Sequence, residues 1–145
     1  MASISRSALL PYSAARIYAL VDDIAAYPQF MQGCVATEVL QRDADSVTAT
    51  LVLGKSGFRY SITTRNLLQP PERMQMTLVD GPFRKFEAVW RFDALSDTAC
   101  KVSFDMQFEF KAGLVDRVLS SLFESTGSEM VNAIAKRAVQ LYGST

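Results

Sequence analysis

The residues that could carry out chemistry are few in this chain, and their spacing forms no familiar catalytic set. The chain has no histidine, which removes Ser–His and Cys–His nucleophilic catalysis and histidine-ligated zinc or haem. Asp22 and Asp23 are adjacent, so their side chains would diverge on a helix and could not work as an acid–base pair. Cys34 and Cys100 lack CxxC spacing, as expected of reduced structural cysteines in an intracellular protein. We therefore predict no catalytic residues, no metal site, no cofactor and no enzymatic activity.

The charged residues give no signature of phosphate or nucleic-acid binding. The segment Gly54–Gly57 connects two predicted strands and opens no helix, so it lacks the geometry of a phosphate-binding loop. Fifteen basic and fifteen acidic residues cancel. The adjacent cations Arg84-Lys85 and Lys136-Arg137 are too few for a nucleic-acid footprint. We expect no DNA partner.

The C-terminal segment predicts a long amphipathic helix over residues 112–142. Its apolar residues recur at steps of three and four, which places them on one side of a helix. Thr126 and Gly127 fall on that side, where Leu or Ile would add about 1.5–3 kcal/mol of burial each. Two interpretations stay open: close packing or a bend at Gly127, or a cavity of ligand size beside these small residues.

The rest of the chain predicts a sheet that this helix must cover. Residues 1–10 suit a strand ended by Pro11, Ser13 is a candidate N-cap for a helix to Asp22, and a second helical turn follows at Ile24–Phe30. From Val35 to Phe110, apolar and polar residues alternate, and short turns separate the predicted strands.

These patterns together predict one α+β domain over residues 1–145. We expect about seven antiparallel strands in a sheet strongly curved around the long C-terminal helix, with the two short helices after the first strand. Forty-nine per cent of the 145 residues are hydrophobic, which suffices for one large core.

The inward positions of the predicted strands are rich in aromatic and methionine residues, among them Phe58, Met74, Met76 and Met106. A curved sheet under a single helix rarely closes completely, and methionine adapts to irregular apolar shapes. Taken singly, each of these residues is more often plain core. Together with the small helix residues they favour a ligand pocket, with Arg65 and Arg137 as candidate polar anchors. The candidate lining is Phe30, Tyr60, Phe83, Trp90, Phe104, Phe108, Phe123, Thr126 and Gly127.

The sequence offers no membrane-spanning or export segment. No apolar run approaches the ~20 residues of a spanning helix, and Pro11 leaves no room for a signal-peptide core before it. We expect a cytoplasmic protein with at most transient membrane contact.

Four stretches of the chain match the motifs of one known family: Tyr27-Pro28-Gln29-Phe30, Thr63-Thr64-Arg65-Asn66, Leu78–Phe83 leading to Trp90-Arg91-Phe92, and Val102–Asp105 through Phe108–Phe110. With them the chain resembles the coenzyme-Q-binding START-domain family, which includes the bacterial ribosome association toxins and is often called polyketide cyclase-like. The resemblance implies a helix-grip fold, an antiparallel sheet wrapped around a long C-terminal helix. One departure is Gly33, where family members usually have an aromatic residue before the cysteine, and we expect it to widen the cavity mouth.

The resemblance also implies what the protein does, and it leaves alternatives. The first is binding or carrying a hydrophobic small molecule in a central cavity, most simply ubiquinone or a related isoprenoid quinone that supports respiration. The second is association with the ribosome, with the large subunit as partner, to block the joining of subunits. The third is a polyketide cyclase-like enzyme, which the missing histidine argues against.

Overall fold

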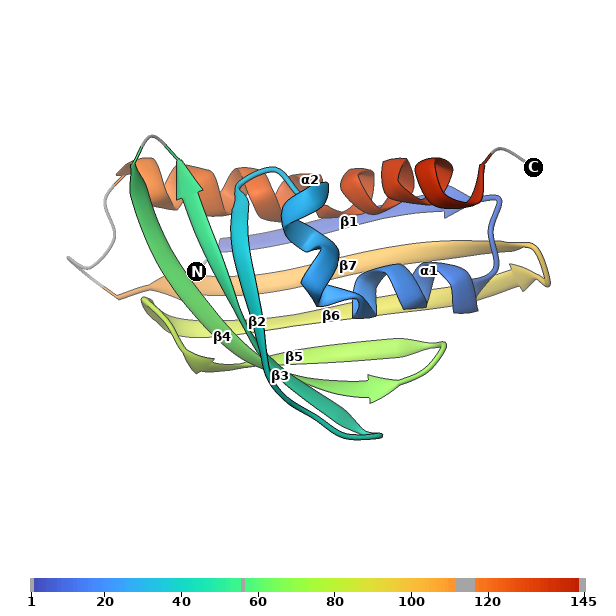
Figure 1. The fold of residues 1–145 in the computed structure, drawn as a ribbon, viewed down its shortest axis with the longest axis horizontal. Coiled ribbons are helices and arrows are strands. Elements are labelled where there is room, and N and C mark those ends of the chain that lie inside the picture. The colour runs from blue at the N-terminus through green and yellow to red at the C-terminus, as the bar shows by residue number, and fades with distance from the viewer. Residues whose placement is uncertain (1, 56, 112–116, 144–145) are drawn as a thin grey trace.

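The computed structural model describes residues 2–55, 57–111 and 117–143, and over these ranges the chain forms one seven-stranded antiparallel sheet and a long helix (Figure 1). The strand order is β1-β7-β6-β5-β4-β3-β2, so the first two strands occupy opposite edges. In chain order the elements are β1 Ala2–Leu10, α1 Ala14–Asp22, the 3-10 helix η1 Ile24–Gln29, β2 Cys34–Arg42, β3 Ser46–Lys55, β4 Phe58–Gln69, β5 Arg73–Asp80, β6 Phe83–Ser96, β7 Ala99–Phe110 and α2 Arg117–Tyr142.

The short helices form where local signals favour them, and they carry the chain from one sheet edge to the other. Pro11 follows β1 directly, and the Ser13 hydroxyl accepts a hydrogen bond from the Arg16 amide at 3.2 Å, which caps α1. The Tyr27 hydroxyl of η1 donates to the Val21 carbonyl at the end of α1. This bond fixes the angle between the two helices beneath the sheet edge.

The sheet is strongly curved, and bulges supply part of the bend. β1, β6 and β7 run along α2, whereas β2, β3 and β4 cross this direction steeply (Figure 1). Register shifts interrupt the β2–β3, β4–β5 and β6–β7 pairings. At each shift one strand has an extra residue, a β-bulge, which bends the strand and increases its twist. The sheet therefore wraps around the helix and presents its concave face to it.

The predicted helix-grip fold is confirmed, and the alternation correctly identifies most inward residues. One exception is Phe58, which is 48% exposed and pairs with Lys55 next to the turn of the β3–β4 hairpin. The described part of α2 begins at Arg117, and residues 112–116 of the predicted helix lie outside the described residues.

Candidate functional site

The concave face of the sheet and α2 enclose a small apolar cavity of about 40 Å³. A water molecule needs roughly 10–15 Å³ of such space, whereas pockets for small organic ligands span about 300–1,000 Å³. A larger guest would therefore require the lining side chains to move. The lining residues are Met31, Leu51, Leu53, Ile62, Thr64, Met76, Phe86, Phe104, Met106, Phe123, Thr126, Gly127 and Met130.

Two threonines are the polar members of this lining, and both hydroxyls donate within the protein. Thr64, which is 1% exposed, donates to the Asn66 side-chain carbonyl at 2.9 Å. The Asn66 amide in turn lies 3.8 Å from the Met74 sulfur. Thr126, which is 7% exposed, donates to the Gln32 backbone carbonyl at 3.2 Å. The cavity thus suits an apolar chain better than a polar head group.

Gly127 marks the closest approach between α2 and the sheet. A Cβ atom at this position would lie 2.6 Å from the Met106 methyl carbon and 3.2 Å from the Ile4 Cδ1. Both distances are far shorter than an ordinary van der Waals contact. The interpretation of close packing therefore holds, and the glycine also borders the cavity.

An aromatic cluster fills the space next to the cavity between β6, β7 and α2. The Phe123 ring of α2 lies 4.8 Å, centroid to centroid, from both Phe83 and Phe108. Phe83 also stacks on Phe110 at 4.7 Å. Phe123 reaches the cavity, whereas Phe83 and Phe108 stand behind the lining and hold it in place.

Other predicted pocket residues likewise support the wall from outside. Trp90 is 1% exposed and packs on Phe104, a lining residue, at 4.6 Å between ring centroids. Tyr60 is half-buried next to the core, and its burial raises the pKa of its hydroxyl above the ordinary value. Of the predicted lining, Phe104, Phe123, Thr126 and Gly127 border the cavity itself.

The two arginines expected as polar anchors do not face the cavity. Arg65 is exposed on the outer face of the sheet, because its neighbours in the alternation, Thr64 and Asn66, take the inward positions. Arg137 donates to the Gln29 side-chain carbonyl at 3.0 Å and lies 5.2 Å over the Phe30 ring. These contacts place Phe30 and Arg137 together, where α2 meets η1.

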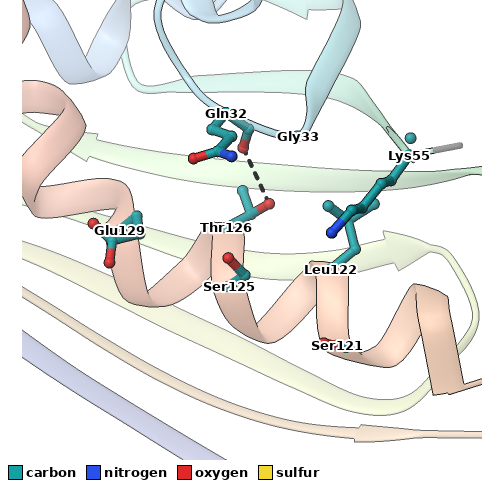
Figure 2. A pocket seen from close by; sticks show the side chains of 9 residues that line it. Gln32, Gly33, Lys55, Ser121, Leu122, Ser125, Thr126 and Glu129 are labelled. Atoms are coloured by element: carbon teal, nitrogen blue, oxygen red, sulfur yellow. Dashed lines mark hydrogen bonds between the residues drawn. The ribbon is translucent and has the colours of Figure 1, made fainter.

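A polar cleft of about 510 Å³ also borders Thr126, the residue that it shares with the cavity (Figure 2). The segment after η1, the end of β3 and one side of α2 form its walls. The sequence pattern does not reveal this cleft, because Lys55 lies in the predicted turn Gly54–Gly57 and Ser125 lies outside the apolar side of the predicted helix. Only the fold brings them together. The lining residues are Gln32, Gly33, Gly54, Lys55, Ser121, Leu122, Ser125, Thr126 and Glu129.

Gly33 lines the cleft and brings the chain after η1 against α2 at Thr126 and Leu122. Its backbone has φ +89°, and an added Cβ would lie 2.5 Å from the Thr126 hydroxyl oxygen and 3.0 Å from the Leu122 Cδ1. Its carbonyl accepts a hydrogen bond from the Gly54 amide at 3.0 Å. The expectation that Gly33 widens the cavity mouth is therefore wrong, since the missing side chain lets the backbone close against the helix.

None of the helices in the described ranges is both long and apolar enough to cross a bilayer. Within those same ranges, no group of three or more Cys, Asp or Glu side chains is placed to hold a metal ion.

Comparisons with known proteins agree with this architecture. The family model described as "Polyketide cyclase / dehydrase and lipid transport" matches residues 10–135. The chain is 41% identical over 140 residues to the ribosome association toxin RatA of Pseudomonas aeruginosa, covering 97% of each protein. It is 31% identical over 144 residues to the mitochondrial coenzyme Q-binding protein COQ10 homolog B of Xenopus laevis, covering 96% of this chain and 59% of that protein.

A solved structure shares the same fold. The START superfamily protein from Mycobacterium smegmatis aligns with a TM-score of 0.77 and 22% identity over 96% of this chain and 98% of that one. At this identity the likeness shows the fold alone. The resemblance inferred from the sequence motifs is confirmed by the relatives. The chain belongs to the polyketide cyclase/dehydrase and lipid transport family, the START-like proteins that include RatA and COQ10 homologues.

Proposed function

We propose that this protein binds a hydrophobic small molecule with an isoprenoid tail, most simply ubiquinone or a related quinone, and thereby supports respiration. The observation that carries this proposal is the apolar cavity between the sheet and α2, whose two hydroxyls already donate within the protein. The name of the COQ10 relative, a coenzyme Q-binding protein, points to the same ligand class.

The composition of the lining explains how so small a cavity could admit a large guest. Four of its thirteen residues are methionines: Met31, Met76, Met106 and Met130. A methionine side chain has three rotatable bonds and no branch, so it changes rotamer at low energetic cost. Each apolar surface that then contacts the ligand contributes about 25 cal/mol per Å² removed from water. We propose that the methionines swing aside and repack along the isoprenoid.

The same lining argues for binding without catalysis. None of the thirteen residues that the described structure places around the cavity carries an acid, a base or a nucleophilic thiol. General acid–base chemistry needs a titratable group within hydrogen-bond reach of the substrate. We therefore propose a binding protein that needs no cofactor.

The test is to extract and identify lipids from freshly purified protein and to titrate decylubiquinone by calorimetry. Ile62→Phe adds a ring inside the cavity and is expected to weaken binding at least tenfold. Val79→Phe is the matched control, because it adds the same ring at a position that is 57% exposed. A wild-type protein that carries no lipid and binds no quinone would contradict the proposal.

Association with the ribosome is the second candidate function. It is favoured by the relatives named ribosome association toxin, one of which is 41% identical over nearly the whole chain. Binding to rRNA through Lys and Arg would weaken steeply as the salt concentration rises. Sucrose gradients of cells that overproduce the protein test this idea. Unchanged proportions of intact ribosomes and free subunits would exclude it.

A further inference from the structure

We propose that the polar cleft over Ser125 and Thr126 is the entrance to the apolar cavity and the binding site for the ligand's head group. The ligand class is an amphiphile whose apolar tail fills the cavity and whose head carries oxygen acceptors, such as carbonyl or methoxy oxygens. This inference rests on the proposed function and adds to it the residues that hold the head.

The first support is that the cleft and the cavity meet at one residue. Thr126 borders both spaces, and it is one of the two polar side chains of the cavity. The cleft is open and has about 510 Å³, whereas the cavity has about 40 Å³. A ligand that spans both would pass Thr126 at the junction between its apolar and polar parts.

The second support is the chemistry of the cleft. Lys55 extends from the end of β3 toward α2, and the Ser125 hydroxyl points into the same space (Figure 2). Within the part of the chain that the structure describes, Lys55 has no ion-pair partner. Glu129, the acid of the cleft, accepts a hydrogen bond from Asn132 at 3.1 Å. The cleft therefore offers donors, which suit a head with oxygen acceptors.

The third support is the contact at Thr126, the residue that borders both spaces. One hydrogen bond, from Thr126 to the Gln32 carbonyl, and the backbone of Gly33 against the helix form this contact. Because Gly33 has no side chain, it contributes only backbone atoms to this contact. The contact can also be locked, since a Cβ at Gly33 would lie 3.8 Å from the Thr126 Cβ. A disulfide requires a Cβ–Cβ distance of about 3.5–4.5 Å.

The first experiment locks this contact. Gly33→Cys and Thr126→Cys are combined with Cys34→Ala, which removes the neighbouring thiol, and uptake of decylubiquinone is followed by quenching of Trp90. Oxidised protein is expected to take up the quinone at least tenfold more slowly than the same protein reduced with dithiothreitol. Equal rates of quinone uptake by the oxidised and the reduced protein would contradict the proposal that the cleft is the entrance. Absence of uptake by wild-type protein would instead overturn the proposed function.

The second experiment tests the head group and does not depend on the disulfide. Lys55→Met keeps the aliphatic stem and removes the charge, and Lys101→Met is the matched control on the outer face of β7. Calorimetry with Lys55→Met is expected to show about tenfold weaker binding of decylubiquinone, the size of one hydrogen bond to a charged group. Binding of decylbenzene, which lacks oxygens, is expected to stay unchanged. Wild-type affinity of Lys55→Met for decylubiquinone would overturn the head-group site.

Discussion

Two glycines allow other parts of the chain to approach the same turn of α2 closely: Gly33, which lies after η1, and Gly127, which lies in α2 itself. Gly33 admits the chain after η1 to one side of the helix at Thr126, and Gly127 admits Met106 and Ile4 to the other side. A side chain at either position would have to displace a neighbouring side chain, Thr126 at Gly33 and Met106 at Gly127. The small residues of α2 are thus explained by contact from both sides.

The contact at Gly127 predicts opposite effects of one substitution in two backgrounds. Gly127→Ala should lower the free energy of unfolding by about 1 kcal/mol in the wild type, because the new methyl overlaps the Met106 methyl and overpacking is costly. In a Met106→Ala background it should raise that free energy by less than the roughly 1 kcal/mol that alanine gains over glycine in a helix, since the overlap with Met106 is gone and only the contact with the Ile4 Cδ1 at 3.2 Å remains.

Chemical denaturation of the wild type, Gly127→Ala, Met106→Ala and the double variant measures the coupling between the two positions. Ser125→Ala, an exposed substitution on the same helix, is the control and should have one effect in both backgrounds. Equal effects of Gly127→Ala with and without the Met106 side chain would contradict the close contact.

At the scale of single residues, the sequence predicts those that repeat with an element and misses those that meet by folding. Thr126 and Gly127 follow from the helical period, because their phase places them on the buried side. Lys55 cannot be found in this way, since it ends a strand and approaches α2 only when the sheet curves. Arg65 shows the opposite error, a residue chosen for its chemistry whose phase on β4 turns it outward.

The elements themselves follow closely from local signals. Pro11 and Ser13 place the end of β1 and the start of α1, and period-two alternation locates the later strands. The curvature of the sheet has no comparable signal, because the bulges in β2, β5 and β6 come from pairing between strands. The cavity and the cleft both depend on this curvature, so neither volume could be predicted.

The cap of α1 gives a prediction at this scale. Ser13→Ala removes the acceptor for the Arg16 amide and should lower the free energy of unfolding by about 1 kcal/mol. Urea denaturation followed by circular dichroism measures the change. Ser7→Ala, an exposed serine of β1, is the control and should have a clearly smaller effect. Equal effects of the two substitutions would show that the cap contributes nothing particular to the helix.

At the scale of the whole molecule, a buried thiol and a buried phenol make the free energy of unfolding depend on pH in the alkaline range. Burial raises the pKa of the Cys34 thiol from 9.0 to about 11 and that of the Tyr18 hydroxyl from 10.0 to about 12. The unfolded chain therefore loses these protons at lower pH than the folded protein does. Their stabilisation is complete below the unfolded values and is lost as pH rises through the folded ones.

We expect the free energy of unfolding to fall as pH rises above about 9. Urea titrations from neutral pH to pH 11 measure this decline. Cys34→Ala should make the curve shallower where the thiol titrates, between its unfolded value of 9.0 and its folded value of about 11. The decline caused by Tyr18 should remain. A variant whose stability follows the same pH curve as the wild type would contradict the assignment to Cys34.

The pairing of β1 with β7 has a consequence for how the molecule comes into being. Ala2 lies opposite Phe108, and Leu10 lies opposite Cys100. β1 therefore cannot pair in the sheet until β7 has been synthesised. During synthesis, the apolar concave face stays open to solvent until β7 and α2 have left the ribosome. Such distant pairing slows folding and leaves the nascent chain prone to aggregation.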